Sequence, residues 1–207
     1  MITSYGIIKK NSAIVNGKVY LKGNQTESFT SFIKKIYNKL ETDYPKFYKM
    51  DNLSKLGFLT SELLLSNKNM SKNYLEVEIG LVFSNHSSSL DTDKKFYSTI
   101  KSYEQYFPSP AVFVYTLPNI MMGEICIRNK FRGENAFFIM EKFDPKFIIQ
   151  YSQNLINTGK IKCCISGWVE LFSDNYESVL FLLEKKAYTE YTKIFKLENI
   201  IRQYKGE

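Results

Sequence analysis

Few residues in this chain have the types and spacing that catalysis needs. His86 is the only histidine, and it follows Ser84 and Asn85 in a polar run, where its imidazole could act as a base or hydrogen-bond within a loop. A mechanism that needs two imidazoles, or a zinc site built mainly from histidine, is excluded within these 207 residues. The chain has no glycine-rich phosphate loop, His-Glu-x-x-His or Cys-x-x-Cys pattern, so we predict no cofactor and no metal site.

The three cysteines favour a reducing environment. Cys126, Cys163 and Cys164 are odd in number and two are adjacent, which is poor material for a disulfide framework. Cys163 and Cys164 lie in an apolar run, as small core residues do. The N-terminus lacks a basic segment followed by a long apolar one, and no stretch approaches the roughly 18 apolar residues of a membrane span. We therefore expect a cytoplasmic protein without a membrane span.

The charge is positive but dispersed. Lys and Arg number 28 against 21 Asp and Glu, which gives a formal net charge of +7. The lysines occur singly or in pairs such as Lys9-Lys10 and Lys94-Lys95, which is typical of solvated faces rather than of a phosphate-binding patch. We expect no nucleic-acid partner, although an acidic protein could use the same surface.

Hydrophobic periodicity predicts strands that alternate with helices. Asn16-Gly17, between two short apolar runs, indicates a hairpin. Apolar residues at spacings of three and four indicate helices, and alternating or short apolar runs indicate strands. The expected helices are one from Thr26 ended by Pro45, one over 52–66, one capped by Asp91 and carrying Phe96, Ile100 and Tyr103, one after Leu117-Pro118-Asn119, and one from Asp144-Pro145 to about Gly159. The expected strands after the hairpin cover 75–83, 136–140, 161–172 and 178–183, and a charged tail follows.

This element order predicts an α/β fold with a largely parallel core that finishes in an antiparallel pair. Repeats, low-complexity segments and linkers are absent from the sequence. One domain over residues 1–207 is therefore the simplest expectation.

A series of motifs between residues 108 and 170 is more specific. In order come Pro108-Ser109-Pro110, Leu117-Pro118-Asn119, Gly133-Glu134-Asn135, a short apolar strand, a helix ending at Gly159, an apolar strand and Gly167-x-x-Glu170. This order resembles the N-terminal half of the β-ketoacyl synthases, the condensing enzymes of fatty-acid and polyketide synthesis. The resemblance covers most of the chain and implies a thiolase-like half, with a mixed, mostly parallel five-stranded sheet flanked by helices.

The resemblance also implies that the catalytic centre is degenerate. Lys142 occupies the position of the family's nucleophilic cysteine, at an elbow where a helix N-terminus stabilises a thiolate. Lysine cannot form the acyl thioester, and Asp144 as helix cap places Lys142 two residues outside the helix. The family's two histidines, or histidine and asparagine, come from a C-terminal half that we expect this chain to lack. We therefore predict no catalytic residue, while a Schiff-base or amine role for Lys142 stays open.

What remains is a pairing function. Ketosynthases dimerise through the strand that corresponds here to Ala136, Phe137, Phe138, Ile139 and Met140, and these five residues are the interface candidates. They could instead face an acyl tunnel or the core. Met121, Met122 and Phe143 are the acyl-pocket candidates, with ordinary helix packing as the alternative for the two methionines.

The resemblance thus implies a noncatalytic subunit that pairs with an active ketosynthase, as a chain length factor does. The setting would be fatty-acid, polyketide or aryl polyene and flexirubin-type pigment synthesis. The alternative is a homodimeric module that binds an acyl chain or an acyl carrier protein without catalysis.

Overall fold

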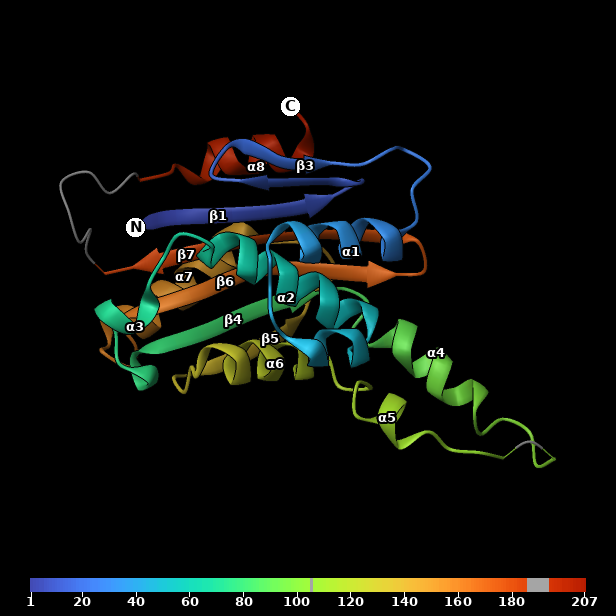
Figure 1. Cartoon of the computed structure of the whole chain (residues 1–207). Coiled ribbons are helices and arrows are strands. Elements are labelled where there is room, and N and C mark those ends of the chain that lie inside the picture. Colours follow the sequence, from blue (N-terminus) through green and yellow to red (C-terminus); the bar gives the residue numbers. More distant parts are fainter. Residues whose placement is uncertain (105, 186–193) are drawn as a thin grey trace.

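The computed structural model describes residues 1–104, 106–185 and 194–207 and confirms an α/β fold (Figure 1). The strands are β1 (Ile2–Lys9), β2 (Ser12–Val15), β3 (Lys18–Lys22), β4 (Ile79–Asn85), β5 (Asn135–Ile139), β6 (Cys163–Phe172) and β7 (Asn175–Glu184). The α-helices are α1 (Phe29–Lys39), α2 (Asn52–Leu65), α3 (Met70–Asn73), α4 (Leu90–Ser98), α5 (Pro110–Phe113), α6 (Ile120–Asn129), α7 (Pro145–Asn157) and α8 (Leu197–Lys205). Two short 3₁₀-helices, η1 (Pro45–Lys49) and η2 (Glu76–Glu78), complete the set for these residues.

All these strands form one sheet, in the order β3-β2-β1-β7-β6-β4-β5. β4 pairs in parallel with β5 and with β6, whereas the other four neighbouring pairs are antiparallel. The predicted number of five strands and the mostly parallel orientation were therefore wrong for the described residues, which contribute seven strands. Periodicity identifies a strand but not its partner, and here the N-terminal β1 inserts beside β7 while the β2–β3 hairpin extends the sheet.

The hairpin has the turn that its sequence predicts. Asn16 and Gly17 have φ angles of 51° and 86°, so both central residues adopt the left-handed conformation that a tight hairpin turn requires. The Asn16 side chain also accepts a hydrogen bond from the backbone N–H of Tyr5 at 2.9 Å, which fixes the turn against β1.

Two apolar clusters pack on the two faces of the sheet. α1, α2 and α6 cover one face, and α7 and α8 cover the other. α2 is buried nearly all round, and the hydroxyls of Thr60 and Ser61 donate to carbonyls of their own helix at 2.8 and 2.7 Å. A Cβ on Gly57 would lie 2.0 Å from the sulfur of Met121, so the glycine lets α6 pack closely against α2.

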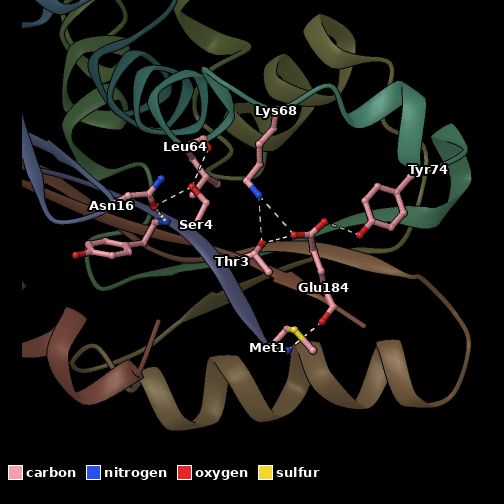
Figure 2. A network of polar contacts seen from close by, with 9 residues as sticks. Met1, Thr3, Ser4, Asn16, Leu64, Lys68, Tyr74 and Glu184 are labelled. Atoms are coloured by element: carbon pink, nitrogen blue, oxygen red, sulfur yellow. Dashed lines mark hydrogen bonds and ion pairs between the residues drawn. The ribbon is translucent and has the colours of Figure 1, made fainter. Parts of the chain in front are cut away.

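A polar network ties β1 to the end of β7 (Figure 2). Glu184 is 4% exposed, and its carboxylate accepts hydrogen bonds from the hydroxyls of Tyr74, at 2.6 Å, and Thr3. The ammonium of Lys68 lies 3.6 Å from the same carboxylate, and the N-terminal amine of Met1 donates to the Glu184 carbonyl at 3.0 Å. Because the buried charge has several donors, this network stabilises the register of β1 against β7.

Several predicted boundaries need correction. The alternating pattern from Leu75 indicated a strand, but η2 occupies its start and exposes Leu75 and Val77, so β4 begins only at Ile79. α1 already ends at Lys39, and Pro45 instead begins η1.

The helix expected to have Asp91 as its cap is capped two residues earlier, at Ser89, and it ends at Ser98, before Ile100 and Tyr103. Part of the predicted charged tail is the helix α8, which packs Ile200 and Tyr204 on the sheet, and the remainder includes residues 186–193 outside the described ranges. The expectations for β5, α2, α6 and α7 are confirmed.

Candidate functional site

Lys142 lies in the short connection between β5 and α7. The Asp144 carboxylate accepts the backbone N–H of Phe147 at 3.0 Å, so it caps α7, whose first residue is Pro145. Lys142 therefore lies two residues before the cap, as predicted, and its side chain is exposed. At this position the ammonium is exposed to solvent. It lies outside the first turn of α7, whose free amides would stabilise the negative charge of a nucleophile such as a thiolate.

His86 lies in the loop that follows β4. Its backbone N–H and that of Ser87 donate to one carboxylate oxygen of Glu170, at 2.7 and 3.1 Å. Its ring Nδ1 lies 3.3 Å from the carbonyl oxygen of Met140. These contacts describe a loop histidine whose backbone is held by the glutamate of the Gly167-x-x-Glu170 motif. Within the described residues, no group of three His, Cys, Asp or Glu side chains could hold a metal ion.

Steric constraints explain why the motif has a glycine at its first position. Gly167 has φ of +154°, and a Cβ there would lie 2.0 Å from the carbonyl oxygen of Val179 on β7. The close approach of β6 to β7 therefore requires glycine. The motif explains the geometry of the sheet and of the loop above it, and neither of its two residues needs a catalytic role.

Cys163 and Cys164 are core residues, as predicted. Cys163 and Cys164 are fully buried, and burial raises the pKa of Cys163 well above its ordinary value and that of Cys164 to about 12. Cys126 is half-buried, and burial raises its pKa as well. At neutral pH these thiols stay protonated and are poor nucleophiles.

The strand of the interface candidates, β5, is the last strand at its edge of the sheet. Its hydrogen bonds to β4 begin with the Leu81 N–H donating to the Glu134 carbonyl at 3.0 Å. They end with the Met140 N–H donating to the Asn85 carbonyl at 2.8 Å. Along a parallel ladder, alternate residues direct both backbone groups to the same neighbour. The residues between, Ala136 and Phe138, therefore also bond β4.

Asn135, Phe137 and Ile139 consequently direct their backbone N–H and C=O groups away from the sheet. In the described part of the chain, no strand pairs with that side of β5. The strand sequence Asn135–Ile139 carries no charge, and the Ile139 side chain is 55% exposed. An uncharged edge with outward backbone groups is a template for pairing with another strand.

The side chains of the five candidates divide between the two faces. Phe137 packs on the α6 side, and Phe138 and Met140 pack on the α7 side. The Phe138 ring lies 5.2 Å from the ring of Phe147 and 5.0 Å from that of Tyr151. Ala136 is half-buried. The side chains therefore anchor the strand in the fold, while its backbone edge stays available.

An open groove of about 470 Å³ runs between α6 and this edge. Its lining residues are Pro118, Asn119, Met122, Gly123, Asn135, Phe137 and Ile139. Sequence reasoning did not single out Gly123 as part of a surface. Its spacing of four from Asn119 along α6, which puts both residues on one helix face, is the signal that could have found it.

Only one of the three acyl-pocket candidates reaches this groove. Met122 borders it, although it is only 3% exposed and also belongs to the core, and Met121 is 1% exposed and packs on α2 beside Gly57. Phe143 lies on the other face of the sheet, where its ring is 5.6 Å from that of Trp168. The structure does not bring these three side chains together.

No protein-family model and no curated protein matches the sequence. Solved structures match the fold. The ishigamide ketosynthase/chain length factor matches with a TM-score of 0.67 and 16% identity, over 91% of this chain and 63% of that chain. A ketosynthase bound to a hexaketide, in complex with its type II polyketide synthase acyl-carrier protein, matches with a TM-score of 0.64 and 14% identity, over 89% of this chain and 62% of that chain. A ketosynthase in complex with its chain length factor from Xenorhabdus doucetiae matches with a TM-score of 0.58 and 14% identity, over 91% of this chain and 79% of that chain.

The chain spans less than two thirds of the length of the first two of these proteins. None of the described helices is long and apolar enough to cross a membrane. The resemblance inferred from the order of motifs is confirmed at the level of the fold. The protein has the thiolase-like fold of the β-ketoacyl synthases, over 91% of its length in the comparison with the ishigamide protein.

Proposed function

We propose that this protein is a noncatalytic ketosynthase-like subunit that pairs through β5 with an active β-ketoacyl synthase, in the manner of a chain length factor. The observation that carries the proposal is the uncharged outer edge of β5, beside the groove along α6. A partner strand laid along this edge satisfies the outward backbone groups of Asn135, Phe137 and Ile139. The fold neighbours support it, since two of the solved structures are described as a ketosynthase with its chain length factor.

The chemistry of the Lys142 position supports a noncatalytic role. An exposed lysine outside the cap of α7 cannot carry an acyl group as a thioester. The chain has a single imidazole, and its backbone and ring contacts are those of a loop residue. Condensation would therefore depend on the partner's active site. We expect the assembled complex to keep its condensing activity when Lys142→Ala is introduced, and loss of activity would restore a chemical role for the amine.

The groove gives the subunit a means to influence product length. Met122 and Phe137 present apolar side chains to it from α6 and β5, so an acyl chain leaving a partner's active site could lie along the shared edge. Met121 and Phe143 would then act through packing. Polyketide, fatty-acid and aryl polyene or flexirubin-type pigment synthesis are the settings in which such a subunit would work. A cytoplasmic location accords with the three free cysteines.

A homodimeric module that binds an acyl chain or an acyl carrier protein is the second candidate. The formal net charge of +7 favours it, because acyl carrier proteins are acidic partners of the kind a basic surface attracts. In that case β5 would pair with β5 of a second copy. One purified chain would then form dimers without any ketosynthase.

Co-expression with the ketosynthase encoded nearest to this chain tests the proposal. We expect a stable one-to-one complex by size-exclusion chromatography and native mass spectrometry. Separate elution of the two proteins at micromolar concentration would contradict pairing. A dimer of this chain alone, without the ketosynthase, would favour the second candidate.

A further inference from the structure

A long excursion leaves the body of the protein between β4 and α6. We call residues 90–104 and 106–117, as the structure describes them, the arm; it contains α4 and α5. In Figure 1 the arm projects beyond the layered body on the side of β5 and away from β3. It follows the loop after β4, the strand that pairs with β5, and it leads into α6, which lines the groove at the β5 edge. Both ends of the arm therefore adjoin the proposed pairing edge.

The arm carries large apolar side chains that the chain itself does not cover. The exposed ones are Leu90, Tyr97, Tyr103, Tyr106, Phe107, Phe113, Val114 and Leu117. Tyr103 is fully exposed and Phe107 is 82% exposed. Single exposed apolar residues are ordinary, but such a concentration on one projecting segment is typical of an interaction surface.

The charges of the arm identify the kind of partner. Asp91, Asp93 and Glu104 balance Lys94, Lys95 and Lys101, so the segment has no net charge although the whole chain has +7. A surface for an anionic membrane or for nucleic acid would concentrate positive charge. A neutral aromatic surface instead fits the apolar face of another protein.

Interface area indicates which protein that is. A stable interface buries roughly 800 Å² on each partner, and one edge of the five-residue strand β5 is too short to supply it. An aromatic side chain buries about 150–250 Å². The five exposed aromatic residues of the arm can therefore provide much of the missing area, on the same side of the molecule as β5.

We propose that the arm clasps the same ketosynthase-fold subunit that pairs with β5, and that Tyr103 and Phe107 are its main contacts. This inference rests on the proposed function. It adds a second, separately mutable surface to the strand edge. Exposed aromatic residues of this kind have the character of hot spots, because they bury a large area with few rotatable bonds.

A double variant of the full chain, Tyr103→Ser with Phe107→Ser, tests the clasp in complex with the ketosynthase. The matched control is Val19→Ser with Leu75→Ser, two exposed apolar residues on β3 and before η2. We expect at least a tenfold increase in the dissociation constant for the arm variant and less than a twofold change for the control. Hydrogen exchange in the arm should slow when the wild-type complex forms.

The outcomes separate the two proposals. If the arm variant binds the ketosynthase with the dissociation constant of the wild type, and hydrogen exchange in the arm does not change on complex formation, the clasp is overturned. Pairing through β5 is then unaffected. Failure of the wild-type chain to form any complex overturns the proposed function and the clasp with it. Circular dichroism melting curves that superimpose for all three proteins exclude unfolding as the cause of weaker binding.

Discussion

The two edge strands of the sheet, β3 and β5, differ in how readily a further strand can pair with them. β3 begins and ends with lysines, Lys18 and Lys22, and its pairing with β2 is irregular between Ala13 and Ile14. Lys39 of α1 reaches over this edge and donates to the Tyr20 carbonyl at 2.5 Å. Charges, an irregular register and a covering side chain are devices that keep an edge strand from pairing.

Within residues 1–104, 106–185 and 194–207, none of these devices is found at β5. Its register with β4 is continuous, its five residues are uncharged, and it borders an open groove. One edge is therefore protected against pairing and the other is left available for it. In a protein that stays folded and dispersed, an unprotected edge indicates a regular partner.

Giving β5 the protection of β3 should have the largest effect. Ile139→Lys places a charge on the exposed last residue of β5, beside the proposed partner strand, and we expect at least a hundredfold weaker pairing with the ketosynthase, about 2.7 kcal/mol. Because Ile139 is already exposed, the melting temperature should change little. Isothermal titration calorimetry measures the loss.

The matched control is Val19→Lys on β3, where an exposed valine lies between two lysines. It should bind the ketosynthase like the wild type. Equal weakening by both variants would mean that charge in general, and not the β5 edge, governs association.

Removing the protection of β3 is the converse change. Lys18→Thr with Lys22→Thr leaves an uncharged edge with high strand propensity, so we expect new self-association through β3. Sedimentation velocity at increasing concentration should show oligomers that the wild type lacks, with an effect of roughly tenfold in the association constant. A variant that stays monomeric would show that the irregular register and Lys39 suffice to protect this edge.

Filling the groove should have a smaller effect. A Cβ on Gly123 meets no atom within 4 Å, so a side chain can start there without a clash, and Gly123→Leu should add about 1 kcal/mol of helix stability. The same leucine occupies the space between α6 and β5. We expect a several-fold lower affinity for a fluorescent acyl probe and shorter products from the assembled complex. Unchanged probe binding together with unchanged product length would remove the groove from the proposed function.

The sequence was sufficient to predict the parts of the fold and of the candidate site that depend on neighbouring residues. The parts that depend on contacts between residues distant in the sequence could not be predicted. The motif order located β5 and the cap of α7, because both are local: a short apolar run, and Asp144 before Pro145. Lys142 could likewise be placed outside the helix from its neighbours alone.

Other features were not local. Met121 and Met122 are adjacent on α6 and both are buried, but only the close approach of Gly57 on α2 decides that Met121 packs on that helix, while Met122 also borders the groove. The antiparallel entry of β1 beside β7 depends on residues about 180 positions apart, such as Thr3 and Glu184, whose hydrogen bond joins the two strands. The arm was missed because Tyr103 was assigned to a helix with Phe96 and Ile100, and because the sequence does not show that the arm's apolar side chains are exposed.

Lowering the pH should have the smallest effect. It should reduce the stability of the pairing between β1 and β7, which is far from β5 in the sheet. Burial acts to raise the pKa of Glu177, but hydrogen bonds from Lys9, at 2.6 Å, and from Tyr204 bring it below the ordinary value. The stabilisation is therefore present above the unfolded pKa of about 4.3 and is lost as pH falls through the lower folded value.

Lys9→Met should thus be less stable than the wild type at pH 7, by less than about 1 kcal/mol. The difference should shrink as the pH falls below 4. Lys142→Met, beside β5, is the control and should show no pH-dependent difference. Chemical denaturation at several pH values measures both, and a Lys9→Met difference that is constant with pH would contradict the assignment.

The outward direction of alternate amides along β5 gives the most direct test of pairing. Hydrogen exchange resolved to single residues should show that the amides of Ala136 and Phe138, which bond β4, are protected in the free chain. The amides of Phe137 and Ile139 should exchange readily in the free chain and at least a hundredfold more slowly in the complex with the ketosynthase. A complex that forms while these two amides exchange as fast as before would contradict pairing through β5.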